Sequence, residues 1–350
     1  MIENFENPFS DYGNIISGKR FIGREASIDA IKNRILRPKD AGNLAIIGEP
    51  RIGKSSLVNH TVMEHKKELI SKNIIPIWIN VATFKQSSSF FRALVTDCYD
   101  ELEDLDLLTK SIKKAKKRAI EDESTWNEGY SKIQRFFKKI RQEGLRILFI
   151  LDEFDHARYL FMNDISGFQG LRELAYRPEW RVTFITTSRR TIREIEEHTH
   201  AISTFDGIFQ KHFLGMFNEI DLQEYFSRLD LTGVTTNQEL KEQIDFYCGN
   251  YPYLLEMIGF EIIETFRKTE QVDFINSVKK AESSLYDQYD RMISLMQEDN
   301  SFSKLLQILI GPIIDVKQTD VDTFLRHGLI KSASDRDYYQ AFSTHFHEYL

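Results

Sequence analysis

Short apolar runs alternate with helix-patterned segments through the first 215 residues of the chain. Five of these runs have the length of β-strands and are flanked by polar or turn residues: 44–47, 74–81, 146–151, 182–186 and 212–214. The run at 146–151 is apolar after its first residue, which is typical of a strand covered on both faces. Strands that alternate with helices predict an α/β fold with a doubly wound parallel sheet over about residues 44–215.

A different pattern begins after Gly215, where helical spacing dominates. The predicted helices lie at 221–229, 238–247, 254–266, 272–297, 303–309 and 321–326. Two β-rich runs, 329–332 and 338–342, would pair as a hairpin across Ser334-Asp335-Arg336. Because helices followed by such a hairpin suggest a winged helix, we expect an α/β core at 1–215, a helical lid at 216–275 and a winged-helix-like domain at 276–350.

The composition is that of a globular protein, because 41% of the 350 residues are hydrophobic and 28% are charged. The net charge of -7 argues against a dominant DNA-binding surface. The two cysteines, Cys98 and Cys248, form no CxxC pair, so they indicate neither a disulfide framework nor a zinc site. The polar N-terminus is unlike a signal peptide, and no apolar run approaches the roughly 18 residues of a membrane span. We therefore expect a cytoplasmic protein with no membrane partner.

The strand at 44–47 leads directly into a glycine-rich loop that fits the pattern GxxxxGK[ST]. The loop and the residue after it read Gly48, Glu49, Pro50, Arg51, Ile52, Gly53, Lys54, Ser55 and Ser56. Its backbone N–H groups and the following helix N-terminus suit a phosphate. Lys54 is expected to reach the β- and γ-phosphates of a nucleotide, and Ser55 to ligate Mg²⁺. The motif therefore predicts a P-loop NTPase core with an ATP or ADP cofactor.

The apolar run that ends at Leu151 delivers two carboxylates to the edge of the sheet where α/β sites lie. Asp152 is expected to hold the Mg²⁺ shell, and Glu153 to orient or deprotonate an attacking water. With Lys54, they are the candidate catalytic residues. The run 182–186 ends in Thr187-Ser188-Arg189-Arg190, whose Ser188 and Arg189 are candidates for sensing the nucleotide. A guanine-reading NKxD element is not evident, so ATP is favoured over GTP.

The order of these motifs resembles the STAND class of AAA+-related ATPases, in its prokaryotic "archaeal ATPase" branch. The resemblance rests on Phe21-Ile22-Gly23-Arg24-Glu25, the two Walker elements, Thr187-Ser188-Arg189 and Gly249-Asn250-Tyr251-Pro252. It implies that Ile22, Gly23 and Arg24 line the adenine side of the pocket and that Pro252 packs against the base or sugar.

Two departures from the family pattern concern the lid and the winged helix. Two residues separate Gly249 from Pro252, where many relatives have one. The winged-helix histidine that touches the phosphate in some relatives has no clean match, and His345 is the nearest candidate for this nucleotide contact. A lone histidine near a helix start is more often structural.

The resemblance implies a slow ATPase that acts as a switch, closed with ADP and open with ATP, in prokaryotic signalling or defence against phage. It also implies self-association on ATP binding. Because no sensor or effector domain is evident, we expect a separate partner protein or a longer chain. The alternatives are an AAA+-like motor or loader on DNA, similar to origin-recognition ATPases, and a nucleotide-binding scaffold that hardly hydrolyses.

A basic run at 110–118 bears on the DNA alternative. It contains Lys110, Lys113, Lys114, Lys116, Lys117 and Arg118. Such a run either binds nucleic acid or forms a solvated helix face, and the second interpretation is favoured by the acidic chain. Asp320 and Asp322 are expected at the start of the second winged-helix helix, where bases are normally contacted, so DNA binding there is not favoured.

Overall fold

The computed structural model describes residues 6–37, 41–121, 126–180, 182–200, 203–332 and 338–350. The chain forms two compact units. The first, here called the loop unit, consists of the N-terminal segment to Glu25, Gly48–Ser56 and Phe213–Leu350. The second, called the sheet unit, consists of Ala26–Ile47 and Leu57–His212. The phosphate-binding loop is therefore assigned to the unit that holds the C-terminal helices.

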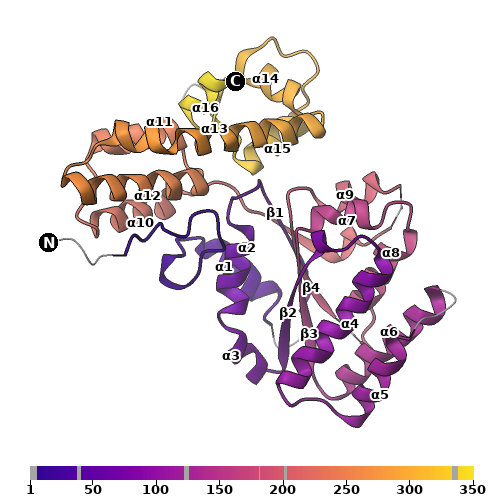
Figure 1. Ribbon diagram of the computed structural model, residues 1–350. Coiled ribbons are helices and arrows are strands. Elements are labelled where there is room, and N and C mark those ends of the chain that lie inside the picture. The colour runs from indigo at the N-terminus through magenta and orange to yellow at the C-terminus, as the bar shows by residue number, and fades with distance from the viewer. Residues whose placement is uncertain (1–5, 38–40, 122–125, 181, 201–202, 333–337) are drawn as a thin grey trace. The chain divides into compact units, whose positions relative to one another are not determined.

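The sheet has five strands in the order β2-β3-β4-β1-β5 (Figure 1). They are β1 (Asn43–Ile47), β2 (Ile74–Asn80), β3 (Arg146–Asp152), β4 (Thr183–Ser188) and β5 (Phe209–Phe213). Pairings β2–β3, β3–β4 and β4–β1 are parallel, which confirms the predicted sheet. β5 begins earlier than the run at 212–214 suggested. It includes the exposed residues Gln210 and Lys211. The outermost strand of a sheet tolerates such polar residues because other elements do not cover it on every side.

Helices flank the sheet on both sides, with α1 and α3 on one side and α4, α5 and α6 on the other (Figure 1). The helices of this part of the chain are α1 (Glu25–Arg34), α2 (Lys54–Val58), α3 (Lys66–Ser71), α4 (Ser87–Asp104), α5 (Lys110–Ala119), α6 (Trp126–Gln142), α7 (Ala157–Leu160), α8 (Ile165–Tyr176) and α9 (Ile192–His198). Short 3₁₀ turns lie at Gly18–Arg20, Val81–Thr83, Phe154–His156 and Asp206–Ile208.

Helix α2, which begins at Lys54, is followed directly by a π-helical turn at Asn59–Met63. The N–H of Glu64 donates to the carbonyl of Asn59, five residues earlier, at 3.0 Å. Such single π turns arise where one extra residue is accommodated in a helix. Hydrophobic spacing alone does not reveal it.

The loop unit is largely helical beyond Phe213. It contains α10 (Glu219–Asp230), α11 (Gln238–Cys248), α12 (Pro252–Thr269), α13 (Phe274–Glu298), α14 (Phe302–Ile310), α15 (Gln318–His327) and α16 (Thr344–Tyr349). Strands β6 (Ile330–Ser332) and β7 (Tyr339–Ala341) pair antiparallel, which confirms the predicted pairing. The turn proposed at Ser334-Asp335-Arg336 lies outside the described residues. Helix α16 was not predicted, and the order α14, α15, β6, β7 is the one expected of a winged helix.

Gly249 ends α11 with a positive φ of 50° and fixes the start of α12. A Cβ at this position would collide with the carbonyl oxygen of Phe342, so the glycine permits a close backbone approach. Pro252 occupies the first turn of α12, where its missing N–H costs no hydrogen bond. The motif Gly249-Asn250-Tyr251-Pro252 is thus a tight helix–helix joint.

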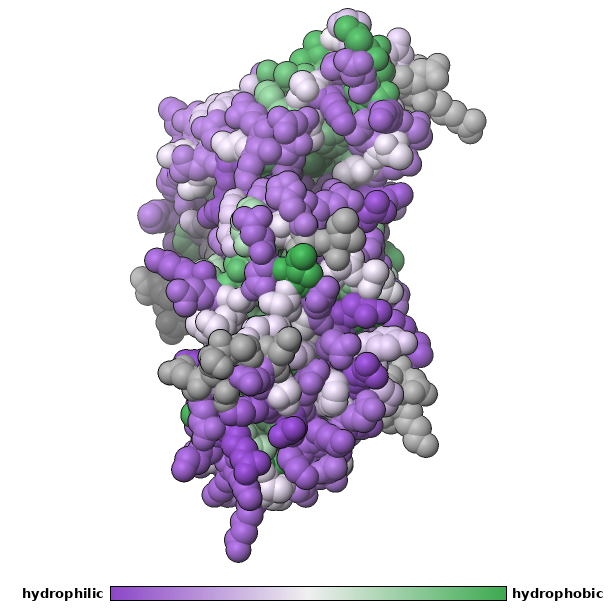
Figure 2. Space-filling view, turned by 90° about the vertical axis from the view of Figure 1, so that its right-hand side faces the viewer, coloured by the Kyte–Doolittle hydropathy of each residue, from purple (hydrophilic) through white to green (hydrophobic). Residues whose placement is uncertain are grey.

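Most of the visible surface in Figure 2 is hydrophilic, with apolar residues gathered towards its upper end. Exposed apolar side chains near the end of α14 and in the segment after it are Ile310, Ile313 and Ile314. Among the described residues, no helix combines the length and apolar character needed to cross a lipid bilayer. Both cysteines are buried and free of disulfides.

A buried carboxyl group lies in α12. Glu256 is only 7% exposed, and its Oε2 atom has no hydrogen-bond partner. Burial raises the pKa of Glu256 to about 8, although the charge of Arg228 acts in the opposite direction. The negative charge of Asp11 adds to the rise in this pKa, and the positive charge of Arg20 reduces it. Glu256 is therefore largely protonated in the folded chain at neutral pH.

We expect Glu256 to make the folded chain less stable as the pH rises. A folded pKa of about 8 against an ordinary value of 4.5 gives stability that is complete below pH 4.5 and lost as the pH rises to 8. The Glu256→Gln variant should flatten this decline in urea-unfolding midpoints measured between these pH values. The matched variant Glu239→Gln, at an exposed position on α11, should retain the wild-type pH dependence. Identical profiles for wild type and Glu256→Gln would contradict this account.

Candidate functional site

Three strands of the sheet unit bring their carboxyl ends to one edge of the sheet. Ile47 at the end of β1 pairs with Ser188 at the end of β4. β4 in turn pairs with β3, which ends at Asp152. Gly48 follows Ile47 in the chain, so the phosphate-binding loop starts from the edge at which Asp152 and Ser188 lie. This is the edge where α/β proteins bind ligands.

Strands β3 and β4 end in interacting polar residues. The Thr187 hydroxyl donates a hydrogen bond to Oδ1 of Asp152, and both side chains are buried. The Ser188 hydroxyl donates to the carbonyl of Arg190 at 2.6 Å. Thr187 therefore orients the carboxylate that was predicted to hold Mg²⁺, while Ser188 shapes the turn after β4.

Glu153 directly follows Asp152 and adopts a left-handed backbone conformation, with φ 56° and ψ 40°. Its side chain is exposed. A residue with a Cβ is uncommon in this region, and such strained positions concentrate at functional sites. The conformation turns the chain sharply after β3 and separates the exposed Glu153 from the buried Asp152. Its catalytic role stays a prediction.

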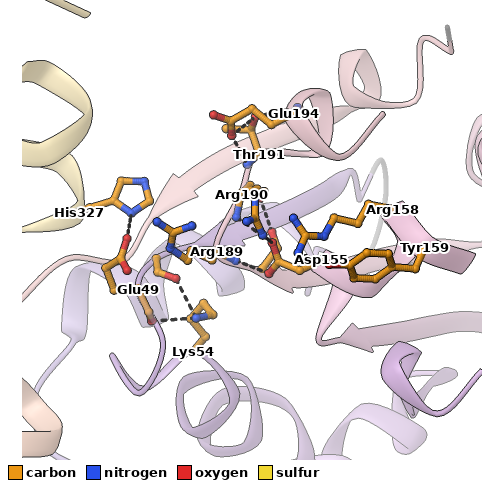
Figure 3. A network of polar contacts seen from close by, with 12 residues as sticks. Glu49, Lys54, Asp155, Arg158, Tyr159, Arg189, Arg190, Thr191, Glu194 and His327 are labelled. Atoms are coloured by element: carbon orange, nitrogen blue, oxygen red, sulfur yellow. Dashed lines mark hydrogen bonds and ion pairs between the residues drawn. The ribbon is translucent and has the colours of Figure 1, made fainter. Parts of the chain in front are cut away.

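Asp155, which the sequence did not single out, organises the turn after β4. Its carboxylate accepts hydrogen bonds from the backbone N–H groups of Arg189 at 2.6 Å and Arg190 at 3.2 Å (Figure 3). The guanidinium of Arg190 also contacts Asp155 at 3.4 Å. The Arg189 side chain is 9% exposed, so this predicted nucleotide sensor is held in a defined place.

Within the loop unit, Lys54 is folded onto the loop that precedes it. Its ammonium group donates to the carbonyl oxygens of Gly48 at 2.8 Å and Glu49 at 2.9 Å (Figure 3). These contacts place the positive charge within the loop Gly48–Ser56. Ser55 is partly exposed, and the hydroxyl of the buried Ser56 accepts a hydrogen bond from the N–H of Ile16 at 3.0 Å.

The C-terminal helices contact the same loop at two points. The Tyr251 hydroxyl donates to the carbonyl of Pro50 and accepts a hydrogen bond from Nε2 of Gln288 at 2.9 Å. Burial raises the pKa of Tyr251, which keeps the hydroxyl protonated as a donor. In addition, the guanidinium of Arg51 lies 4.2 Å from the centre of the Tyr253 ring.

Helix α15 reaches the loop through a histidine. Nδ1 of His327 lies 2.7 Å from Oε1 of Glu49, and Glu49 is 1% exposed (Figure 3). Together with the Tyr251 contact, this pair connects the loop to both the predicted lid and the predicted winged-helix-like domain. The sequence placed Glu49 in the predicted phosphate-binding loop but did not single out His327.

Arg24 connects the N-terminal segment to the loop. Its guanidinium donates to the carbonyls of Ile52 at 3.1 Å, Gly215 at 2.7 Å and Met216 at 3.1 Å. It also lies 4.7 Å from the centre of the Phe217 ring. Burial lowers the pKa of Arg24 to about 10, and the carboxylate of Asp221 partly offsets the effect. The side chain is thus a charged anchor of the loop backbone at neutral pH.

Gly23 and the buried Ile22 precede this anchor. Gly23 has a φ of 56°, and a Cβ there would collide with the carboxylate of Asp221. Asp221 also accepts a hydrogen bond from the N–H of Arg24 at 2.9 Å. The glycine therefore permits a close approach of α10, which is a structural reason for it besides the predicted contact with adenine. That contact stays a prediction for Ile22, Gly23 and Arg24.

The remaining predicted contacts, Pro252 and His345, lie in the helical region. Pro252 is buried and follows Tyr251, the residue that bonds the loop. His345 sits in the first turn of α16, where its Nδ1 is 3.3 Å from the Tyr289 hydroxyl and its ring is 4.6 Å from that of Tyr247. Burial lowers the pKa of His345. The histidine that contacts the loop is His327.

The donors of the loop unit suit the phosphates of a nucleotide. The loop carries a cationic Lys54 and a helix N-terminus, and the sheet edge carries the buried carboxylate of Asp152. Within the described residues no cluster of three or more His, Cys, Asp and Glu side chains could hold a metal by itself.

Comparisons with known proteins agree with this geometry. Residues 36–188 match the family described as AAA domain. The Walker-type ATPase PABY2304 of Pyrococcus abyssi has a similar structure, with 13% identity over 94% of this chain and 96% of that chain and a TM-score of 0.57.

The ORC2 protein of Aeropyrum pernix, solved as ADPNP–ADP complexes, has 12% identity over 95% of this chain and 96% of that chain and a TM-score of 0.51. A comparison with curated protein sequences found no match. The chain has the fold of a P-loop ATPase, and its residues 36–188 resemble an AAA domain.

The contact between Tyr251 and the loop gives a direct test. Tyr251→Phe leaves the part-buried Pro50 carbonyl and the Gln288 amide without this partner, so the free energy of unfolding should fall by about 1–3 kcal/mol. Tyr253→Phe keeps its ring under Arg51 and should change stability by less than about 0.5 kcal/mol. Urea unfolding followed by circular dichroism measures both. Equal effects of the two variants would show that the Tyr251 hydroxyl does not hold the loop.

Proposed function

We propose that this chain is an ATP-binding and slowly ATP-hydrolysing switch of the STAND type. The observation that carries the proposal is that Gly48–Ser56 shares one compact unit with the C-terminal helices. Glu49 contacts His327 of α15, and Pro50 contacts Tyr251 at the start of α12. A change in the nucleotide at the loop therefore acts directly on residues that the lid and the winged-helix-like domain bind.

The switch requires that ADP and ATP favour different arrangements, since a ligand shifts an equilibrium only by its differential affinity for the two states. We infer that Lys54 provides this difference. Its ammonium group donates to the carbonyls of Gly48 and Glu49, and a γ-phosphate would compete for the same donors. If Lys54 left the Glu49 carbonyl, the position of Glu49 would change, and with it the contact between Glu49 and His327.

The individual roles follow the chemistry of the residues. We assign Ser55 and Asp152 to Mg²⁺, with Asp152 oriented by Thr187. Glu153 orients or deprotonates the attacking water, and Arg189 senses the nucleotide from a turn that Asp155 holds. Hydrolysis then returns the chain to the ADP-bound arrangement. Self-association on ATP binding and a separate effector, in signalling or antiviral defence, complete the proposal.

An AAA-type ATPase that acts on DNA is the alternative. The loop contacts favour the switch because they involve α12 and α15, and α15 begins with acidic residues. Asp320 in its first turn bonds the N–H of Lys317 at 2.9 Å and Nζ of Lys304 at 2.7 Å. A carboxylate so placed would repel the phosphates of a duplex docked at this helix start.

The nucleotide that copurifies with the chain tests the proposal. Purified without added nucleotide and then denatured, the wild type should release close to one ADP per chain, identified by ion-exchange chromatography. Lys54→Ala should release almost none, because the loop loses its phosphate-binding cation. Lys279→Ala, at an exposed position on α13, should release as much ADP as the wild type. A wild-type chain that is empty and turns over ATP freely would exclude a locked switch.

The contact between Glu49 and His327 should control how fast the nucleotide leaves. His327→Ala removes a hydrogen bond to a charged group worth about 1.5–3 kcal/mol, so release of a fluorescent ADP analogue should accelerate roughly 10- to 100-fold. Stopped-flow fluorescence measures this rate, and His347→Ala on α16 is the matched control. If His327→Ala releases the nucleotide at the wild-type rate, the contact between α15 and the loop does not control nucleotide exchange.

A further inference from the structure

Two neighbouring helices of the sheet unit concentrate positive charge in an acidic protein. Helices α5 and α6 pack against each other and carry eleven lysines and arginines but only one acidic residue, Glu128. The whole chain has 46 basic and 53 acidic residues. The sequence showed only the run at 110–118, whereas the fold adds the basic residues of α6 to it. This concentration is not used by the proposed switch.

The two helices enclose a groove of about 370 Å³. The side chains that line it come mostly from the basic residues of both helices: Lys114, Arg118, Lys132, Arg135, Lys138 and Lys139. Ser111, Ala115 and Glu121 complete the lining. Figure 2 faces the side on which α5 and α6 lie, and its lower part is mostly hydrophilic. Positive charge is thus gathered around a concave surface open to solvent.

The basic side chains in the groove repeat at helical intervals. Lys114 and Arg118 are one turn apart on α5, and Arg135 and Lys139 are one turn apart on α6. Residues four apart on a helix share a face and are separated by about 6 Å along its axis. Glu121 pairs with Lys132 at 3.5 Å and is the single acid in the lining. Two parallel rows of cations suit a ligand with regularly repeated negative charges.

The other side chains exclude several kinds of partner. The lining contains no aromatic residue, so it offers no platform for stacked bases and no aromatic anchor of the kind found in protein–protein interfaces. No large apolar side chain of the described parts of α5 and α6 is exposed. Insertion into a lipid surface requires such an apolar face. The chemistry that remains is recognition of phosphates.

We propose that the groove between α5 and α6 binds the phosphate backbone of a nucleic acid duplex without sequence preference. Lysines and arginines on exposed helix faces neutralise phosphates, and the affinity then depends steeply on salt. Binding here needs neither the winged-helix-like domain nor a particular nucleotide state, so it stands or falls separately from the proposed switch.

Fluorescence anisotropy of a labelled mixed-sequence DNA duplex of about 30 base pairs tests this site, with an RNA duplex of the same sequence as a second probe. The full chain is titrated at salt concentrations from about 50 to 200 mM. Lys114→Glu with Arg118→Glu alters the α5 row, and Arg135→Glu with Lys139→Glu alters the α6 row. Lys268→Glu with Lys279→Glu introduces the same charge change at exposed positions of α12 and α13.

Each groove variant should weaken duplex binding at least tenfold and flatten the log–log salt dependence by about 1.8, the value for two lost phosphate contacts. The control variant should bind within twofold of the wild type, and thermal melts should show that all four proteins are folded. A higher affinity for one of the two duplexes identifies whether DNA or RNA supplies the phosphates. No binding of either duplex by the wild type, or an equal loss of binding in the control variant, would overturn the proposal.

Discussion

The loop from Gly48 to Ser56 must direct its N–H groups towards a phosphate, so its carbonyl oxygens need donors from elsewhere. Lys54 donates to two of them within the loop. Tyr251 supplies the donor for Pro50, and Arg24 supplies the donor for Ile52. This requirement explains why segments far apart in the sequence form one compact unit with the loop. The same donors make the loop sensitive to the helices that carry them.

Buried charge strengthens this dependence. Glu49 and Arg24 are both removed from water, and each retains partners that compensate its charge. Loss of one member of such a pair is far more costly than loss of an exposed ion pair, because the other charge stays buried. The basic groove of the sheet unit, by contrast, is lined by exposed and partly exposed side chains.

The sequence predicted the strands and the phosphate-binding loop well because their signals are local. The run 146–151 is buried at each position, and the motif around Lys54 has fixed spacing. His327 and Asp155 could not be found in this way, since a single histidine or aspartate has no pattern until the fold supplies its partner. Tyr251 belongs to the motif Gly249-Asn250-Tyr251-Pro252, but the sequence predicted a role only for Pro252. Gly23 was assigned to the nucleotide, whereas the structure also gives it a packing reason, the approach of Asp221.

The loop unit consists of segments that are far apart in the sequence, and this affects how the protein folds during synthesis on the ribosome. Pro50 is separated from Tyr251 by 201 residues, and Glu49 from His327 by 278 residues. At a synthesis rate of roughly 5–20 residues per second, the loop waits on the order of 15–55 seconds before His327 exists. During this interval the sheet unit can already fold around the chain on either side of the loop. The nascent protein therefore acquires a folded scaffold first, and its phosphate-binding loop reaches its final surroundings last.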